Sequence, residues 1–216
     1  MHYTLHNYFR SSTSARVRMA LALKGIEYTY KSYSLLENEH RDKPYLALNP
    51  EGLVPALETQ DGTISQSMAI LEYLEDVHPT PALLPSTPIE KARVRSLAHS
   101  IALDIHPVNN LRLLRYIRSE FGADDEGVAK WFKHWVKEMF VPLEKRLSME
   151  ADTGDYCHGS SPTIADVCLV AQVANNQRFN VSMKDYPTIN RINALCLESP
   201  AFQAGMPMNQ PDAPTS

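Results

Sequence analysis

The chain has 216 residues and a mass of 24.3 kDa, and 44% of its residues are hydrophobic, so it can build one large or two small folded domains. With 21 Lys and Arg against 25 Asp and Glu it has no excess of cations for nucleic acid, and its eight glycines form neither a dinucleotide-binding nor a P-loop motif. Cys157, Cys168 and Cys196 are too widely spaced for a disulfide framework or a zinc site, and we find neither an export signal nor a membrane-length apolar run, so we expect a cytoplasmic protein.

Strand and helix signals alternate over residues 1–80, which predicts an α/β domain. One helix is expected over about 12–24, where Gly25 ends it, and a second over about 67–77, with Ser67 as its N-cap. Strands are predicted at residues 2–8, 28–34, 56–59 and 63–64.

Four prolines within residues 79–88 forbid a regular helix or a central strand. We therefore expect a linker at 81–88, between the α/β domain at 1–80 and an all-helical domain at 89–216. In the helical part, Thr163 and Asp166 form a variant of the capping box at a helix start. Helices are predicted at about 89–120, 126–150, 163–176 and 188–197, followed by an irregular tail at 205–216.

Residues 10–16, Arg-Ser-Ser-Thr-Ser-Ala-Arg, place four hydroxyl side chains and two arginines where the first strand ends and a helix begins. The start of a helix has free N–H groups and a partial positive charge, which stabilise an anion. The segment therefore predicts an anion site. Clusters of Ser and Thr are also common at helix starts simply because one of them caps the helix. On this segment alone, an anion site and a simple N-cap both stay open.

A second candidate site combines Pro55, just before a predicted strand, with Gln66 and Ser67 at the next helix start. A cis bond before Pro55 would expose the backbone of Val54 to an extended peptide, and the helix start can accept a carboxylate. Taken alone, Pro55 is better explained as an edge-strand proline. The combination predicts a site that reads a peptide.

The order of the predicted elements, with a Val-Pro pair after the first β-α-β unit and a proline-rich linker before the helices, resembles that of the cytosolic glutathione transferases over nearly the whole chain. Residues 11–18, Ser-Ser-Thr-Ser-Ala-Arg-Val-Arg, are similar to the zeta-class signature S-S-C-S-x-R-V-R, and residues 22–25, 48–50, 66–70 and 210–212 agree with that class too. The resemblance implies a thioredoxin-like N-terminal domain, an all-α C-terminal domain and glutathione as the cofactor.

Within this resemblance Ser11 matches the catalytic serine, whose hydroxyl is expected to hydrogen-bond the glutathione sulfur, with Ser12 and Arg10 as further catalytic residues. The physical chemistry agrees, because a helix N-terminus lowers a thiol pKa from its usual value of about 8.5. The residues implied to contact glutathione are Ser11, Ser12, Thr13, His40, Val54, Pro55, Gln66, Ser67, His106 and Asn110.

Three of these contacts have a specific expected form. Val54 would pair with the cysteinyl backbone of glutathione, and Gln66 and Ser67 would hold its γ-glutamyl end. His40 falls where the family has a polar residue near the glycyl carboxylate, although it can also be a solvated loop histidine.

One position departs from the signature, since Thr13 stands where the zeta class commonly has cysteine. Threonine can form neither a thiolate nor a thiol adduct, so the only reactive sulfur would be that of glutathione. The change is similar to that in bacterial members of this branch that isomerise maleylpyruvate. It argues against cysteine-dependent behaviour and leaves the expected fold unchanged.

In the second half, Pro107 lies inside a long predicted helix and should kink it. Composition alone favours a solvated helix face here, and a structural ion pair for Arg178. The resemblance instead implies that this region and Arg178 contact ligand, since planar guanidinium groups suit a substrate with two carboxyl groups. The implied substrate-binding residues are Arg10, Arg16, His106, Arg112 and Arg178.

Two other patterns carry less weight. His99 and His106 could share a helix face, but no third ligand has suitable spacing, so no metal site is expected. Trp131 and Trp135 are better explained as core residues than as a stacking platform.

The resemblance implies a glutathione-dependent cis–trans isomerase that converts maleylacetoacetate or maleylpyruvate to the fumaryl isomer in aromatic amino acid or aromatic acid breakdown. His106 is a candidate donor to the transient enolate, but no residue is an unambiguous one. Two alternatives stay open: a glutathione transferase that conjugates or dehalogenates small electrophiles such as α-halo acids, and a non-catalytic glutathione-binding protein. A homodimer without nucleic-acid or membrane partners is also implied.

Overall fold

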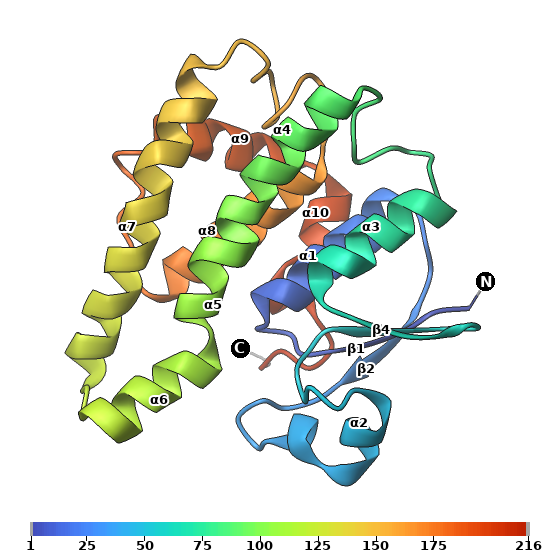
Figure 1. Ribbon diagram of the computed structural model, residues 1–216, viewed down its shortest axis with the longest axis vertical. Helices are drawn as coiled ribbons and strands as arrows, with labels where there is room; N and C mark the ends of the chain where they lie inside the picture. The colour runs from blue at the N-terminus through green and yellow to red at the C-terminus, as the bar shows by residue number, and fades with distance from the viewer. Residues whose placement is uncertain (1, 215–216) are drawn as a thin grey trace. The chain divides into compact units, whose positions relative to one another are not determined.

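The computed structural model describes residues 2–214, which form two compact units (Figure 1). The first unit is made of Met1–Leu83 together with Leu197–Ser216, and the second of Leu84–Cys196. Their boundary falls inside the linker expected at 81–88. The C-terminal segment differs from the expectation, because the helical domain was predicted to include all of 89–216, whereas residues from 197 onward pack with the first unit.

A four-stranded mixed sheet forms the centre of the first unit. Its spatial order is β2-β1-β3-β4, in which β1 runs parallel to β2 and antiparallel to β3, and β3 runs antiparallel to β4. Leu5 of β1 and Leu57 of β3 face each other across the sheet and are fully buried. The strands are β1 (Thr4–Asn7), β2 (Thr29–Ser32), β3 (Ala56–Thr59) and β4 (Gly62–Ser65), shorter at the first two than predicted.

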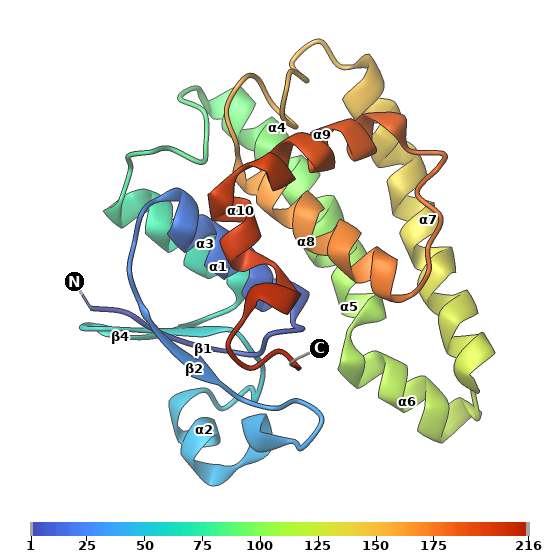
Figure 2. The same ribbon diagram turned by 180° about the vertical axis from the view of Figure 1, so that it is seen from behind.

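Helices cover both sides of this sheet. Figures 1 and 2 show α1 (Ser12–Leu23) and α3 (Ser67–Val77) on one side and α2 (Lys43–Leu48) on the other. The sequence predicted α1 and α3 but neither α2 nor the short 3-10 helix η1 (Glu39–Arg41). Gly25 follows α1 with φ +66°, as its helix-ending role requires. The topology is that of a thioredoxin-like domain.

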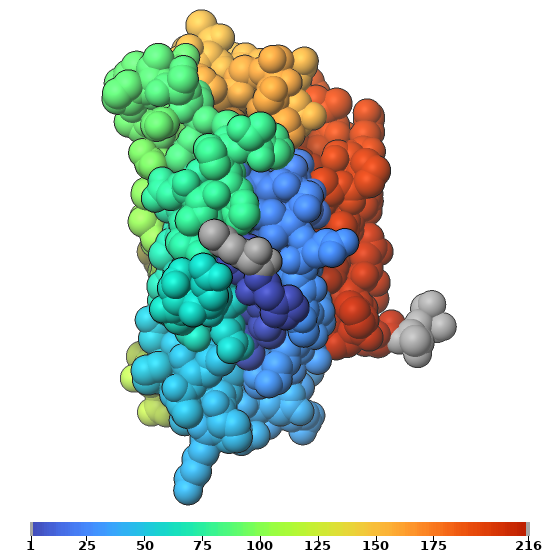
Figure 3. Space-filling model, turned by 90° about the vertical axis from the view of Figure 1, so that its right-hand side faces the viewer, coloured from blue at the N-terminus to red at the C-terminus, as the bar shows by residue number. Residues whose placement is uncertain are grey.

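The C-terminal segment joins the first unit through the contact of α10 (Pro200–Gly205) with α1. Gly205 makes this contact possible, because a Cβ at this position would collide with the side chain and the backbone nitrogen of Met19. Figure 2 shows α10 beside α1, and in Figure 3 red C-terminal residues lie beside blue residues of the N-terminal part of the chain. The predicted irregular tail therefore contains a helix end and the 3-10 helix η3 (Pro207–Asn209).

The second unit is helical. The continuous helix predicted over 89–120 is divided into four pieces, because Pro107 cannot donate to a carbonyl in the preceding turn and the chain passes through a π-helix before it. The elements are α4 (Pro88–His99), the π-helix η2 (Ser100–Ile105), α5 (His106–Asn109), α6 (Leu111–Phe121), α7 (Asp125–Met149), α8 (Ile164–Arg178) and α9 (Pro187–Glu198), whose last residues, from Leu197, belong to the first unit.

The core of the second unit gathers around α8, which packs against α4 and η2. The predicted capping box at its start is confirmed. The Thr163 side chain accepts from the Asp166 backbone N–H, and the Asp166 carboxylate accepts from the backbone N–H and the hydroxyl of Thr163. The Asp166 carboxylate is fully buried and also accepts from the Cys157 backbone N–H at 2.7 Å. Trp131 donates its indole N–H to the carbonyl of Val108 at 2.8 Å, so it ties α7 to α5.

Candidate functional site

Ser11 stands at the start of α1 as its N-cap. Its Oγ accepts from the backbone N–H of Ser14 at 3.1 Å, and its own N–H donates to the carbonyl of Tyr8 at 3.1 Å. The N-cap interpretation of this segment is therefore confirmed, and the anion site stays a prediction. The cap also fixes its oxygen at the positive end of α1, where an anion is favoured.

Thr13 connects this serine to a distant part of the chain. Its Oγ1 donates to the carbonyl of Val54 at 3.0 Å and lies 2.8 Å from the Ser11 Oγ. A threonine hydroxyl has one hydrogen, so the Ser11 hydroxyl must be the donor in the shorter bond. The peptide bond between Val54 and Pro55 is cis, and the loop that holds it lies directly beside the start of α1.

A second helix start lies nearby in the same unit. The N-cap of α3 is Gln66 and not Ser67, which is the first helical residue. Gln66 has φ +70°, a strained conformation for a residue with a side chain. Its amide donates to the carboxylate of Glu51 at 2.7 Å, and Ser65 donates to the other oxygen of that carboxylate at 3.1 Å. Glu51 thus orients the segment that leads into α3.

Arg16 joins the two helix starts. It is 1% exposed, and its Nη1 donates to the Ser67 Oγ at 3.3 Å. Arg16 was predicted to bind substrate, but its side chain is buried inside the first unit and is not exposed to a ligand. Arg16 instead fixes the Ser67 side chain from inside the first unit.

Two further predicted residues of the first unit differ in exposure. His40 lies in η1 and is 8% exposed, so it is not the solvated loop histidine of the alternative interpretation. Arg10 is partly exposed, and its guanidinium carbon lies 5.7 Å from the centre of the Phe9 ring. Its Nε is buried and has no hydrogen-bond partner among the residues that the structure describes.

The predicted ligand contacts of the second unit fall at helix ends. His106 begins α5, and Asn110 caps α6 by accepting from Leu113 N–H at 3.0 Å, while its amide donates to the Pro107 carbonyl at 3.1 Å. The Asn110 side chain therefore has a structural use that the sequence analysis did not foresee. Arg112 is exposed in the first turn of α6.

Arg178 is exposed at the end of α8, and its guanidinium carbon lies 5.1 Å from the centre of the Phe179 ring. Phe179 in turn stacks on Phe132 with ring centres 3.9 Å apart. The Arg178 guanidinium group therefore lies within cation–π distance of an aromatic ring that is itself stacked on a second one.

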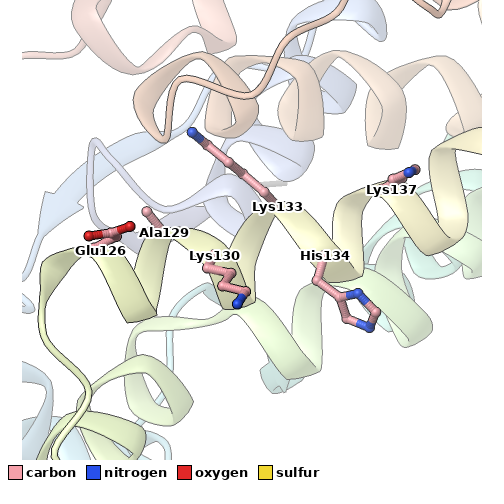
Figure 4. A pocket seen from close by; sticks show the side chains of 6 residues that line it. All are labelled: Glu126, Ala129, Lys130, Lys133, His134 and Lys137. Atoms are coloured by element: carbon pink, nitrogen blue, oxygen red, sulfur yellow. The ribbon is translucent and has the colours of Figure 1, made fainter.

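A surface hollow of about 430 Å³ lies elsewhere, along α7 (Figure 4). Figure 4 shows its lining side chains projecting from successive turns of this one helix, so the hollow is a basic helix face and not an enclosed site. Its lining residues are Glu126, Ala129, Lys130, Lys133, His134 and Lys137. Over residues 2–214 no helix is long and apolar enough to cross a membrane, and no three acidic, His or Cys side chains are grouped to hold a metal ion.

Three residues to which the sequence assigned no role also hold these segments. Arg18 donates to the Phe9 carbonyl, Asp212 accepts from the Phe9 N–H, and Glu51 accepts from the Gln66 amide. For Arg18 and Asp212 a signal existed, because they belong to the motifs at 11–18 and 210–212. The contacts of Arg18 could not be predicted because a charged side chain suggests exposure, whereas Arg18 is buried. Those of Asp212 could not be predicted because Phe9 lies 203 positions away in the chain. Glu51 carries no motif.

Comparison with known proteins agrees with this fold. The family model of the glutathione S-transferase N-terminal domain matches residues 1–76. The maleylpyruvate isomerase of a Ralstonia species is 44% identical over 209 residues, which cover 97% of this chain and 99% of that protein. The fold and these similarities thus define a glutathione S-transferase.

Two solved structures are similar over almost the whole chain. The holo structure of a bacterial zeta-class maleylpyruvate isomerase has a TM-score of 0.96 and 43% identity, and covers 99% of this chain and 100% of its own. The maleylacetoacetate isomerase of Methylobacterium extorquens, solved with malonate and glutathione, has a TM-score of 0.95 and 36% identity, and covers 98% and 100%. This chain belongs to the zeta class of the glutathione S-transferase family.

Proposed function

We propose that this protein is a glutathione-dependent cis–trans isomerase of a maleyl diketo acid, either maleylpyruvate or maleylacetoacetate. The observation that carries the proposal is the placement of the Ser11 hydroxyl at the N-terminus of α1. This hydroxyl donates a hydrogen bond to Thr13 and accepts one from the Ser14 N–H. The relatives named above act on these two substrates by name, and they match nearly the full chain.

The residues of the first unit fit glutathione, a tripeptide with a central thiol and a carboxylate at each end. The start of α1 suits a thiolate, and the loop at Val54, which lies within hydrogen-bond reach of Thr13, suits the cysteinyl backbone. The start of α3, with Ser67 held by Arg16, suits the γ-glutamyl carboxylate. His40, mostly buried in η1, remains our proposal for the glycyl end.

When bound, glutathione supplies a sulfur nucleophile that can add to the substrate double bond and leave again after rotation about that bond. Ser11 supports the anionic sulfur by turning its hydroxyl hydrogen from Thr13 toward it, which exchanges one hydrogen bond for a stronger, charge-assisted one. The first amides of α1, including that of Ser12, and the helix dipole act in the same direction.

The substrate carries carboxylates, for which arginine forks are the preferred partners. Arg10, Arg112 and Arg178 are our candidates, because none of them is buried and each follows from the family resemblance. His106 is our candidate for a donor to the carbonyl oxygen conjugated with the double bond. Arg16 is removed from this set by its burial.

The experiment is to incubate the protein with maleylpyruvate, and separately with maleylacetoacetate, in the presence of a small amount of glutathione. We expect many equivalents of fumaryl product per glutathione, with the total glutathione unchanged, because the sulfur is released in each cycle. Stoichiometric loss of glutathione without fumaryl product would overturn the proposal and favour the transferase alternative, for which α-halo acids are the test substrates. Glutathione binding without turnover of either kind would favour the non-catalytic alternative.

The proposal includes a cellular setting and an assembly state. We propose that the protein works as a cytoplasmic homodimer in aromatic amino acid or aromatic acid breakdown, without nucleic acid or membrane as partner. A sedimentation experiment at micromolar concentration tests the dimer, and a single species of 24.3 kDa would contradict it.

A further inference from the structure

We propose that Asp212, in the C-terminal segment, is a positioning residue that sets the place of the Ser11 hydroxyl by holding the turn between β1 and α1. This inference rests on the proposed use of glutathione and adds a residue that acts without touching it. The turn consists of Tyr8, Phe9 and Arg10, which lead directly into Ser11.

The first observation is the contact between Asp212 and the turn itself. One carboxylate oxygen accepts from the backbone N–H of Phe9 at 3.0 Å, and the other accepts from the hydroxyl of Tyr30 on β2. Phe9 is 5% exposed, so its amide has little access to water that could replace the carboxylate. Asp212 thus joins the sheet and the turn from 203 positions further along the chain.

The second observation is that Arg18 binds the backbone carbonyls of the same turn. Its guanidinium donates to the carbonyls of Tyr8 at 3.3 Å and Phe9 at 2.9 Å, and also to Gly205 at 3.0 Å. Arg18 is 1% exposed, and burial lowers the pKa of its guanidinium, an effect that the nearby Asp212 charge opposes. A buried cation and a carboxylate from the C-terminal segment therefore act on one dipeptide.

The third observation is that the C-terminal segment is itself fixed. The Gln210 amide donates to the carbonyls of Ala204 at 2.8 Å and Met206 at 2.7 Å, which folds the segment back on α10. Since Gly205 lies against Met19 of α1, the path from α1 through Gly205 and Gln210 to Asp212 is held at each step. The segment can therefore serve as a rigid support.

The peptide unit between Tyr8 and Phe9 connects these contacts to Ser11. The Tyr8 carbonyl that accepts from Arg18 also accepts from the Ser11 N–H, so the position of Ser11 follows that of the turn. Loss of the Asp212 carboxylate would leave the Phe9 amide unpaired, and the turn would sample more positions. The Ser11 hydroxyl would then meet a bound sulfur less often, and the pKa of the bound thiol would rise.

The sign of this change separates a positioning role from a charge effect. A carboxylate near a thiolate disfavours the thiolate, so if Asp212 acted only through its charge, its removal would lower the thiol pKa. If it acts by position, Asp212→Ala raises the thiol pKa, whereas Asp212→Asn keeps it close to that of the unchanged protein. The asparagine oxygen can still accept from Phe9, and its amide can donate to the Tyr30 oxygen.

The experiment titrates the ultraviolet absorption of the glutathione thiolate bound to the full chain as a function of pH. We expect Asp212→Ala to raise the thiol pKa by about one unit, which is roughly tenfold less thiolate at a fixed pH below it. Asp212→Asn should restore the original value, and binding of S-methylglutathione, which has no ionisable thiol, should stay unchanged in both variants. Asp61→Asn, in the turn between β3 and β4, is the matched control for loss of a carboxylate, and it should leave the pKa of the bound thiol unchanged.

An unshifted or lowered thiol pKa in folded Asp212→Ala would overturn the inference. If that variant does not fold, Tyr30→Phe takes its place: it leaves Asp212 bonded to Phe9 alone, and a rise in the thiol pKa is expected, whereas no rise overturns the inference. The titration needs glutathione binding but no isomerisation. Failure of the unchanged protein to isomerise, with the Asp212 shift present, would therefore count against the proposed function and not against the positioning role.

Discussion

Thr13 and Val54 are joined by a hydrogen bond of 3.0 Å from a side-chain hydroxyl to a backbone carbonyl. Through this bond the hydroxyl of Ser11 becomes part of a chain of donors that runs from Ser14 N–H to the Val54 carbonyl. A cysteine at position 13, as is common in the zeta class, has a longer and weaker donor and would tie these segments less firmly.

Replacement of Thr13 by valine tests this chain. Valine has a similar shape but no hydroxyl, so the Val54 loop loses its tie to α1 while the packing is kept. We expect KM for glutathione to rise about tenfold, which corresponds to the loss of one hydrogen bond of about 1.4 kcal/mol. Thr13→Ser keeps the hydroxyl and should retain the original KM. Equal KM values in all three proteins would show that the tie does not support glutathione binding.

Replacement of Ser11 by alanine removes the proposed donor to the sulfur. We expect turnover to fall by roughly 10²–10³-fold, as for other losses of a hydrogen bond to a reactive anion, with a raised pKa of the bound thiol. The free energy of unfolding should also fall by about 1 kcal/mol, because the N-cap of α1 is lost. Steady-state kinetics and urea unfolding measure the two effects.

The matched control for this loss of a cap is Thr87→Ala, which removes the capping box of α4 in the second unit. Its stability should decrease by a similar amount while turnover stays unchanged. If both variants lost activity in proportion to their stability, Ser11 would have no role beyond capping.

His6 should make the stability of the first unit depend on pH. This side chain is 2% exposed between Tyr33 and Glu58, and burial lowers its pKa more than Glu58 raises it. Below about pH 6.5 the unfolded chain therefore binds a proton that the folded chain resists, so the stabilisation present above that pH is lost as the pH falls. Tyr45 and Lys31 also face this ring, and the Lys31 charge acts in the same direction as burial.

Urea unfolding at pH 7, 6 and 5 measures this dependence. The unchanged protein should lose stability with a slope of at most about 1.4 kcal/mol per pH unit more than His6→Gln, which stays neutral throughout. His2→Gln at an exposed position should keep the slope of the unchanged protein. A His6→Gln variant with the same slope would assign the pH dependence to other groups.

Gly205→Ala tests the contact of α10 with α1. The added methyl group would meet the Met19 side chain and its backbone nitrogen, which cannot both move away. We expect a loss of roughly 1–3 kcal/mol in the free energy of unfolding. Gly127→Ala in the first turn of α7 introduces the same methyl group beside side-chain atoms only and should leave stability unchanged or raise it. Equal stability of the two variants would contradict the close approach at Gly205.

The predictions that succeeded rest on local signals. Ser11 at a strand-to-helix transition, the Thr163–Asp166 capping box and Gly25 after α1 each act within a few residues, so their patterns were visible in the sequence. The helices of the second unit were found for the same reason, since their apolar spacing is regular, although η2 and Pro107 divide the first of them in a way that periodicity does not reveal.

The predictions that failed concern contacts between distant segments. Arg16 carries a charge, which suggests exposure, and only the structure shows it bonded to Ser67 in the interior of the first unit. The tail after Gly205 is mostly irregular, as its prolines predict, but no pattern indicated that its residue Asp212 contacts Phe9 and Tyr30. Sequence patterns report the face that a residue presents along its own element, and they carry no information on a partner about 200 positions away.

The first unit is discontinuous, and this fixes the order in which a ribosome can complete it. Chains fold from the N-terminus as they emerge, but the turn before Ser11 lacks its supports until Gly205 and Asp212 have been translated. The helices of Leu84–Cys196 leave the ribosome before those supports do. A message truncated just after the helical unit would therefore yield a chain that contains the turn before Ser11 but lacks Gly205 and Asp212, which hold that turn in place.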